Sequence, residues 1–215
     1  MQNGRIKAVI FDLGRVLIDF DHHIAAGKIA AFTDKTPEDI YAMFFDSSLT
    51  AHFEEGRISP RDFFLQVKDK LKLKIAYEEF VPIWNDIFFL TDKNRLVYRM
   101  AKSLKEAYKL ALLSNINVLH FEYIKKKFPI LDAFHNVIVS CEAGAIKPNP
   151  LIYRLALDRL GVLPEEVFYA DDRLELIAAA KELGIQGFVF KGTERLKHDL
   201  IASGINLNAS EGVYK

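Results

Sequence analysis

Cysteine is nearly absent from this sequence, and so is any long hydrophobic run. Cys141 is the single cysteine among 215 residues, which excludes a disulfide within the chain and is typical of a reducing compartment. No apolar stretch approaches the ~18 residues that a membrane-spanning helix needs. The first residues, MQNGRIKAVIF, also lack the layout of a signal peptide, because Asp12 and Arg15 interrupt the apolar stretch. We therefore expect a cytoplasmic protein with no membrane partner.

An excess of one charge is missing as well. Lys and Arg together number 29, and Asp and Glu together also number 29. Nucleic-acid-binding domains usually carry a clear basic excess, so we expect no nucleic-acid partner. Half of the residues are hydrophobic and 27% are charged, which is a globular composition. The length suits one large domain, or one domain with a modest insertion.

Short apolar runs recur along the chain, and several end on polar residues. They lack the alternation of a half-exposed strand, which is typical of strands buried on both faces of a parallel sheet. These runs lie at 7–12, 109–115, 136–140, 166–172 and 187–191. Helical patterns separate them, for example one that begins at Asn149 and Pro150 and ends at Gly161. Alternating strands and helices predict an α/β fold with a doubly wound parallel sheet.

Residues 20–90 have a different character. This segment holds 10 of the 17 phenylalanines and the single tryptophan, Trp84, and it contains no buried-strand run. Thr36-Pro37 and Ser59-Pro60, each followed by an aspartate, are typical helix starts. We predict an α-helical insertion at 20–90 between two parts of an α/β core, 1–19 and 91–215. The aromatic residues are interpreted as a small helical core, although a dimer surface is also open, so we expect a monomer or a homodimer.

Four strand ends carry residues suited to handling a phosphoryl group, namely Asp12, Ser114-Asn115, Lys147 in the loop after a strand, and Asp171-Asp172. Ligands of open α/β sheets bind outside the carboxyl ends of the strands, so these residues are expected to meet. A carboxylate can form an acyl-phosphate, a hydroxyl and backbone N–H groups can hold phosphoryl oxygens, and a lysine can offset negative charge. An acidic pair together with Asp12 can hold Mg²⁺, which prefers oxygen ligands.

These motifs, in their order and spacing, resemble those of the haloacid dehalogenase-like (HAD) phosphohydrolases, which have a Rossmann-like core. The similar stretches are FDLGRVLIDFD, LLSN, Lys147-Pro148 and FYADD, and HFEEGRIS at 52–59 is similar to sequences of the family's helical cap. The subgroup with a helical cap after the first strand is the most similar. It includes bacterial glucose-1-phosphate phosphatases and the phosphatase domain of soluble epoxide hydrolases.

The resemblance implies a role for each of these residues. Asp12 would be the nucleophile and a Mg²⁺ ligand, with the main-chain carbonyl of Gly14 and the carboxylate of Asp172 as further ligands. Asp171 would support the metal site from behind or hold Lys147. Ser114 and the backbone of Asn115 would bind phosphate, and Lys147 would balance its charge. The implied activity is Mg²⁺-dependent hydrolysis of a small phosphate ester through an aspartyl-phosphate.

Two positions depart from the pattern of the wider family. Gly14 stands where many members have an aspartate that protonates the leaving group, although the glucose-1-phosphate-like subgroup shares the glycine. Such an acid is worth roughly 10²–10⁴ in rate, so we hypothesise a sugar 1-phosphate or a similarly activated ester as the substrate. Asp19, Asp21, His22 and His23 are alternative proton sources, or ordinary polar residues near the cap. Leu176 replaces a usual Asp or Asn, which removes an outer support of the metal.

Three other functions stay open on these residues. A non-catalytic or regulatory relative would explain Gly14 and Leu176 but not the retained nucleophile. A metal-free 2-haloacid dehalogenase has no need of the acidic pair at 171–172, and a phosphomutase normally uses the aspartate that Gly14 replaces. In the cap, Glu55 and Arg57 are interpreted either as residues that contact the substrate or as a surface ion pair.

Overall fold

The centre of the molecule is a five-stranded parallel sheet. The computed structural model describes residues 5–45 and 48–207. The strand order is β5-β4-β1-β6-β7, and every neighbouring pair is parallel. The strands are β1 (Ala8–Phe11), β4 (Lys109–Ser114), β5 (Asn136–Val139), β6 (Val167–Asp171) and β7 (Gln186–Val189). Each lies within one residue or two of a predicted run, so the α/β fold with a doubly wound parallel sheet is confirmed.

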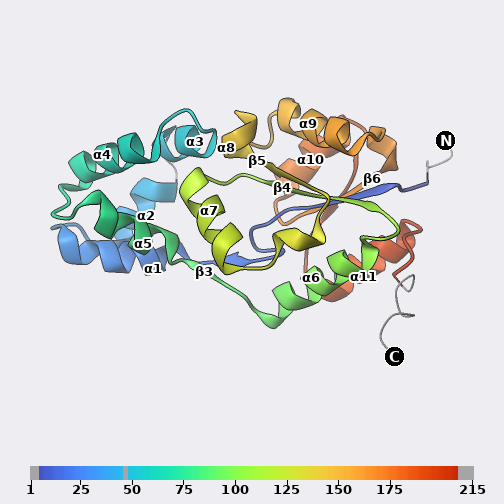
Figure 1. Cartoon of the computed structure of the whole chain (residues 1–215), viewed down its shortest axis with the longest axis horizontal. Coiled ribbons are helices and arrows are strands. Elements are labelled where there is room, and N and C mark those ends of the chain that lie inside the picture. Colours follow the sequence, from blue (N-terminus) through green and yellow to red (C-terminus); the bar gives the residue numbers. More distant parts are fainter. Residues whose placement is uncertain (1–4, 46–47, 208–215) are drawn as a thin grey trace.

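Helices cover both faces of this sheet (Figure 1). One face packs against α6 (Asp92–Leu104), α7 (Val118–Lys127) and α11 (Thr193–Ala202). The other packs against α9 (Pro150–Leu160) and α10 (Leu174–Glu182). Successive strand residues point to opposite faces, so both faces of the strands must be apolar. That requirement explains the continuous apolar runs in the sequence.

A group of helices lies between β1 and β4 in the chain and to one side of the sheet in space (Figure 1). Its members are α1 (His22–Ile29), α2 (Pro37–Phe45), α3 (Ser48–Glu54), α4 (Pro60–Leu71) and α5 (Tyr77–Asn85). They share a separate apolar core in which Phe53, Phe63, Phe80 and Trp84 are buried. The predicted helical insertion is thus present, and its aromatic residues form a core. The boundaries of the insertion at 20–90 and of the core at 1–19 and 91–215 stay a prediction.

A short antiparallel ribbon joins the helical insertion to the sheet. It consists of β2 (Asp19–Phe20) and β3 (Phe88–Phe89), which pair with each other. Two-residue strands leave no hydrophobic pattern, and the sequence analysis did not predict them. At the far end of the ribbon, Lys93 donates to the carboxylate of Asp19 at 2.7 Å, which ties the two strands to the start of α6.

Helix starts follow local side-chain chemistry. Asn149 accepts a hydrogen bond from the N–H of Leu151 at 3.0 Å at the start of α9, and Ser59 accepts one from Asp62 at 3.1 Å at the start of α4. Such caps satisfy N–H groups that have no partner inside the helix. A short helix, α8 (Ser140–Ala143), follows β5 and precedes the loop of Lys147.

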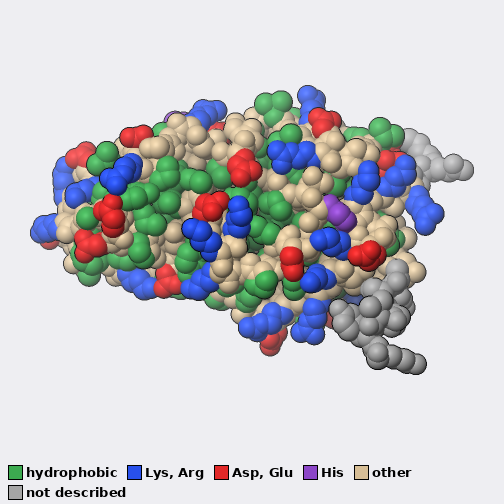
Figure 2. Space-filling view, in the orientation of Figure 1, with side chains coloured by type: hydrophobic (Ala, Val, Ile, Leu, Met, Phe, Trp, Pro, Cys, Tyr) green, Lys and Arg blue, Asp and Glu red, His purple; other side chains and the backbone are tan. Residues whose placement is uncertain are grey.

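The surface carries both charges. On the face shown in Figure 2, hydrophobic side chains gather over the helical insertion, and Lys, Arg, Asp and Glu are interspersed over the sheet domain. Among the helices of residues 5–45 and 48–207, none combines the length and the apolar character needed to cross a membrane.

Candidate active site

Polar side chains meet at the carboxyl ends of β1, β4 and β6. Asp12 directly follows β1, and its N–H donates to the carbonyl of Ala170 on β6 at 2.9 Å. Ser114 is the last residue of β4, and Asp171 is the last residue of β6. Because the strands are parallel, these ends lie at one edge of the sheet, where open α/β sheets bind ligands. The expected meeting of these residues is found.

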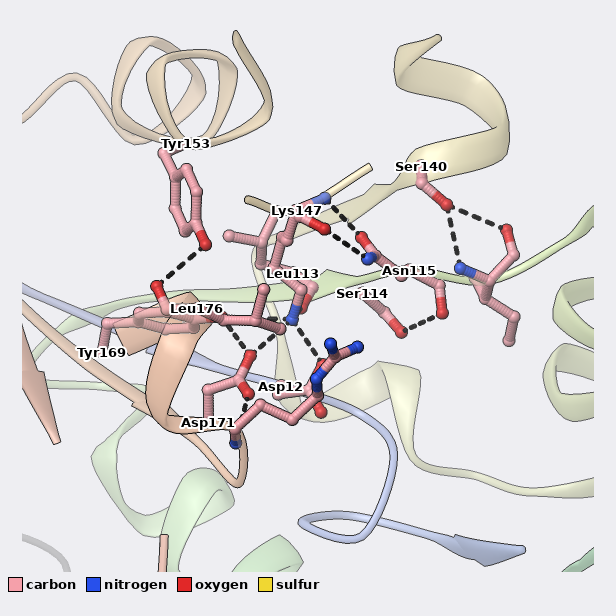
Figure 3. Close-up of polar contacts among 12 residues, drawn as sticks. Asp12, Leu113, Ser114, Asn115, Ser140, Lys147, Tyr153, Tyr169, Asp171 and Leu176 are labelled. Atoms are coloured by element: carbon pink, nitrogen blue, oxygen red, sulfur yellow. Dashed lines mark hydrogen bonds and ion pairs between the residues drawn. The ribbon is translucent and has the colours of Figure 1, made fainter. Parts of the chain in front are cut away.

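Lys147 is the centre of the polar cluster (Figure 3), and its ammonium group is almost completely buried. Its Nζ donates to Asp12 at 2.7 Å and to Asp171 at 2.6 Å. It also donates to the carbonyl of Leu113 at 3.0 Å and lies 3.1 Å from the hydroxyl of Tyr169. Tyr169 in turn donates to Asp171. Burial would lower the pKa of Lys147, but the two carboxylates outweigh it and hold this pKa above its usual value.

The loop of Lys147 is held by the side chain of Asn115. The Oδ1 atom of Asn115 accepts from the backbone N–H of Lys147 at 2.7 Å, and its Nδ2 donates to the carbonyl of Lys147 at 2.9 Å. This pair of bonds, visible in Figure 3, joins the loop after β5 to the end of β4. Asn115 therefore uses its side chain for structure, so only its backbone and the hydroxyl of Ser114 stay available to a ligand.

Three carboxylates form a tight group. Oxygen atoms of Asp12, Asp171 and Asp172 all lie within 4.8 Å of one another. Burial is the main reason that the pKa of Asp12 is raised to about 7, with Lys147 opposing and Asp171 adding to the rise. Burial, followed by the charge of Asp171, also raises the pKa of Asp172. A divalent cation among these oxygens would offset their mutual repulsion.

In the turn after Asp12, the ring of Phe20 lies close to Gly14. A Cβ atom at Gly14 would lie 2.9 Å from the ring atom Cε1 of Phe20, so an aromatic ring fills the space where another side chain would begin. The guanidinium of Arg15 lies over the same ring, 4.9 Å from its centroid. Asn94 and Lys93 at the start of α6 donate to the carbonyls of Val16 and Arg15, which fixes the turn.

The cluster opens into a cavity of about 570 Å³ between the sheet and the helical insertion. Asp12, Gly14, Ser114, Asn115, Lys147 and Asp172 all line it. Asp171 does not line the cavity. It is fully buried behind Lys147, and its second oxygen accepts from the N–H of Arg173 at 2.9 Å. Leu176 lines the cavity with a buried side chain, and its carbonyl accepts from Tyr153 at 3.0 Å (Figure 3).

Several polar residues in and next to the insertion were candidates for contact with a substrate, and four of them bond to other residues of the chain. Glu55 and Arg57 pair with each other at 2.7 Å and do not line the cavity, so the surface-pair interpretation describes them. Asp19 is bound to Lys93 and Thr91, and Asp21 caps α1, where it accepts from His23.

Histidine and glutamate side chains also line the insertion's side of the cavity. His22 lines it, and burial lowers the pKa of that imidazole to about 4, so it is neutral. His120 and Glu54, which were not predicted from the sequence, line the cavity as well. His120 had no sequence signal, and Glu54 could not be told from the neighbouring Glu55.

Known proteins share both the sequence and the fold. Residues 6–184 match the family model of the haloacid dehalogenase-like hydrolases. The chain is 27% identical over 189 residues to D-ribitol-5-phosphate phosphatase of Bacteroides thetaiotaomicron, covering 85% of this chain and 91% of that protein.

Solved structures of related proteins have a similar fold. A HAD family enzyme from Bacteroides thetaiotaomicron, in complex with magnesium and inorganic phosphate, superposes with a TM-score of 0.78 at 27% identity over 90% of this chain and 98% of that one. L-2-haloacid dehalogenase from Xanthobacter autotrophicus, with a TM-score of 0.62 at 22% identity over 95% of this chain and 87% of that one, shows a shared fold alone. The chain belongs to the haloacid dehalogenase-like hydrolase family.

Proposed function

We propose that this phosphoric monoester hydrolase acts on a small hydroxylated phosphate ester, with Asp12 as the nucleophile and Mg²⁺ as the cofactor. The observation that carries the proposal is the arrangement around Lys147, which bonds Asp12 at 2.7 Å and Asp171 at 2.6 Å at the floor of an open cavity. A buried lysine beside a cavity-facing carboxylate lets an anionic nucleophile approach an anionic substrate.

The donor atoms present fit Mg²⁺. The carboxylates of Asp12 and Asp172 and the main-chain carbonyl of Gly14 would hold it, because hard cations prefer oxygen ligands and Mg²⁺ is commonly bound by one or two carboxylates plus substrate phosphate. Asp171 is already committed to Lys147 and to Arg173, so we assign it a supporting role. When bound, the metal would neutralise charge on the phosphoryl oxygens.

The residues at the cavity then have the following roles in the reaction. A carboxylate oxygen of Asp12 attacks phosphorus, the bond between phosphorus and the leaving oxygen breaks, and that oxygen takes a proton from water to leave as the alcohol. Ser114 and the backbone N–H of Asn115 hold the non-reacting phosphoryl oxygens, and Lys147 balances their charge. Water hydrolyses the aspartyl-phosphate in a second step, which restores Asp12 and releases inorganic phosphate.

The missing acid shapes the substrate proposal. Residue 14 is a glycine and offers no carboxylate, and the ring of Phe20 lies 2.9 Å from where a Cβ atom would be. The anomeric oxygen of a sugar 1-phosphate needs less help from an acid to leave than the oxygen of a simple alcohol does. A sugar 1-phosphate therefore stays our hypothesis for the preferred ester. The similarity to a protein named D-ribitol-5-phosphate phosphatase supports a small sugar or sugar alcohol in the cavity, but with a phosphate on a primary alcohol. A panel that contains both kinds of ester tests the hypothesis directly.

The test is phosphate release from 4-nitrophenyl phosphate and from a panel of sugar and sugar-alcohol phosphates. It is run with Mg²⁺, with a chelator, and with Asp12→Asn. We expect turnover that needs the metal and is lost in the variant, and we expect anomeric phosphates to rank above primary ones. Faster turnover of primary phosphates would refute the substrate hypothesis alone. No turnover on any ester by folded protein would favour the regulatory alternative.

A further inference from the structure

The wall of the cavity formed by the helical insertion carries one carboxylate among its described residues, that of Glu54. The rest of this wall includes Phe20, Trp84 and Phe88. His22 lies on the same side and, like His120 from α7, is neutral, because burial lowers the pKa of these imidazoles to about 4 and about 3. Burial raises the pKa of Glu54 to about 7, against the opposing charge of Arg173.

The position of Glu54 is fixed by a joint between α3 and α8, which lie side by side in Figure 1. The hydroxyl of Ser140 donates to the carbonyl of Glu54 at 2.6 Å and accepts from the N–H of Ile116 at 2.9 Å. Ser140 and the neighbouring Asn115 are both seen in Figure 3. The backbone of Glu54 is thereby linked to the loop that follows Ser114, the candidate phosphate-binding residue.

The close approach of Gly56 reinforces this joint. A Cβ atom at Gly56 would lie 2.3 Å from the carbonyl oxygen of Cys141, so only a glycine allows α3 to end so close to α8. Gly56 also has φ +71°, a conformation that suits glycine. The end of α3 thus packs closely against the start of α8, and Glu54, the last residue of α3, lines the cavity next to this contact.

The cations that line the cavity already have partners. Lys147 is bonded to Asp12 and Asp171, and Arg173 is bonded to Glu175 at 2.7 Å. Arg15 lies over the ring of Phe20. A second anionic group on a substrate, placed toward the insertion, would thus meet the carboxylate of Glu54, whose charge Arg173 offsets only in part, since the pKa of Glu54 stays raised.

We propose that Glu54 is a specificity-determining residue that hydrogen-bonds a hydroxyl of the alcohol part of the substrate and disfavours esters carrying a carboxylate. The inference rests on the proposed phosphatase function. A hydroxyl can donate to the ionised carboxylate or accept from the protonated one, whereas a substrate carboxylate is repelled by the ionised form. Like charges in a partly dry cavity give discrimination of roughly tenfold to 100-fold in kcat/KM.

The test compares two esters that differ in one group. Glycerol 3-phosphate carries a CH₂OH group where 3-phosphoglycerate carries a carboxylate, and the rest of each molecule is similar in size. The ratio of their kcat/KM values is measured for the wild type, Glu54→Gln, Glu54→Asp and Glu55→Gln. Glu55 is the matched control, because it is the neighbouring glutamate and its carboxylate bonds Arg57 at 2.7 Å instead of lining the cavity.

We expect the wild type to favour glycerol 3-phosphate and Glu54→Gln to reduce that preference at least tenfold. Glu54→Asp should retain most of it, and Glu55→Gln should leave it unchanged. The preference of the wild type should also grow between pH 6 and pH 8 as Glu54 loses its proton, and it should grow less in Glu54→Gln. The other charged or titratable groups lining this cavity are Asp12, Arg15, His22, His120, Lys147, Asp172 and Arg173. All of them are retained in Glu54→Gln, so the part of the pH dependence that Glu54 causes is the difference between the wild type and this variant.

An unchanged ratio in active Glu54→Gln would overturn the inference, and so would an equal change in Glu55→Gln. Loss of the preference in Glu54→Asp would also count against a charge-based role. If the wild type fails to hydrolyse even 4-nitrophenyl phosphate with Mg²⁺, the proposed function falls and the inference falls with it. That outcome is distinct from an active enzyme whose selectivity ignores Glu54.

Discussion

Replacing Lys147 with methionine should destabilise the protein, and the loss should grow with pH. The ammonium group of Lys147 is the only positively charged group that bonds Asp12 and Asp171 among the residues that the structure describes. Methionine keeps most of the volume of the side chain but removes the charge. Two carboxylates would then share a buried space with no cation, unless one of them takes up a proton.

The size of the effect follows from the lost ion pair and from the repulsion between the two carboxylates. Removing one partner of a buried ion pair typically costs about 3–5 kcal/mol. Two carboxylate oxygens within 4.8 Å of each other repel by at least about 3.5 kcal/mol at an effective dielectric constant of ~20. We therefore expect Lys147→Met to lower the free energy of unfolding by about 3–5 kcal/mol near pH 8.

The pH dependence follows from the pKa of Asp12, which the fold raises from 3.8 to about 7. The folded state binds this proton more tightly than the unfolded chain, so the stability from protonation is present at low pH and is lost as the pH rises through about 7. Lys147 opposes the rise, so its removal moves the pKa of Asp12 higher still. Each pH unit above about 7 then adds up to ~1.4 kcal/mol to the difference between variant and wild type.

Urea unfolding with a chelator present, at pH 6 and at pH 8.5, measures both quantities. Lys109→Met is the control, because Lys109 is exposed and its Nζ donates to a backbone carbonyl, that of Leu160 at 2.7 Å. It should cost about 0.5–1.5 kcal/mol at both pH values. A loss below ~1 kcal/mol for Lys147→Met at pH 8.5, or a loss that shrinks as the pH rises, would refute the reasoning.

Two further predictions concern close approaches of the backbone. Gly14→Asp alone should fail to speed hydrolysis of primary alkyl phosphates, because the new Cβ would lie 2.9 Å from the ring of Phe20. Gly14→Asp combined with Phe20→Ala should raise kcat on these esters at least about tenfold over Phe20→Ala alone, and acceleration by the single variant would contradict this. Gly56→Ala should cost roughly 1–3 kcal/mol in thermal or urea unfolding, since its Cβ would meet the carbonyl of Cys141 and its φ is +71°. Gly27 lies inside α1, and a Cβ atom there would have no neighbour within 4 Å, so Gly27→Ala should raise the free energy of unfolding by about 0.5–1 kcal/mol. Equal changes in stability for Gly56→Ala and Gly27→Ala would contradict this prediction.

The carboxylates around Lys147 could be predicted, because each follows from a pattern of residues adjacent in the sequence. Asp12 and Asp171 each end a buried apolar run, and parallel strands bring such ends to one edge of the sheet. The start of α9 at Asn149 and Pro150 likewise depends on residues next to each other in the chain. These features need no knowledge of distant contacts.

Distant contacts decide what could not be predicted. Glu54, and not Glu55, lines the cavity, and the carbonyl of Glu54 accepts from Ser140, which is 86 residues away in the sequence. Phe20 reaches the space beside Gly14 because it lies on a two-residue ribbon, which is too short to leave a pattern. Tyr169 reads as an ordinary apolar strand residue, yet its hydroxyl bonds Asp171.

The central claim is that Asp12 becomes phosphorylated during turnover. The most direct measurement is rapid acid quenching of the enzyme during hydrolysis of 4-nitrophenyl phosphate with Mg²⁺, followed by peptide mass spectrometry. We predict an acid-stable, base-labile phosphoryl group on the peptide that contains Asp12, and none in Asp12→Asn. Turnover without any phosphorylated peptide, or with the phosphoryl group on another residue, would contradict it.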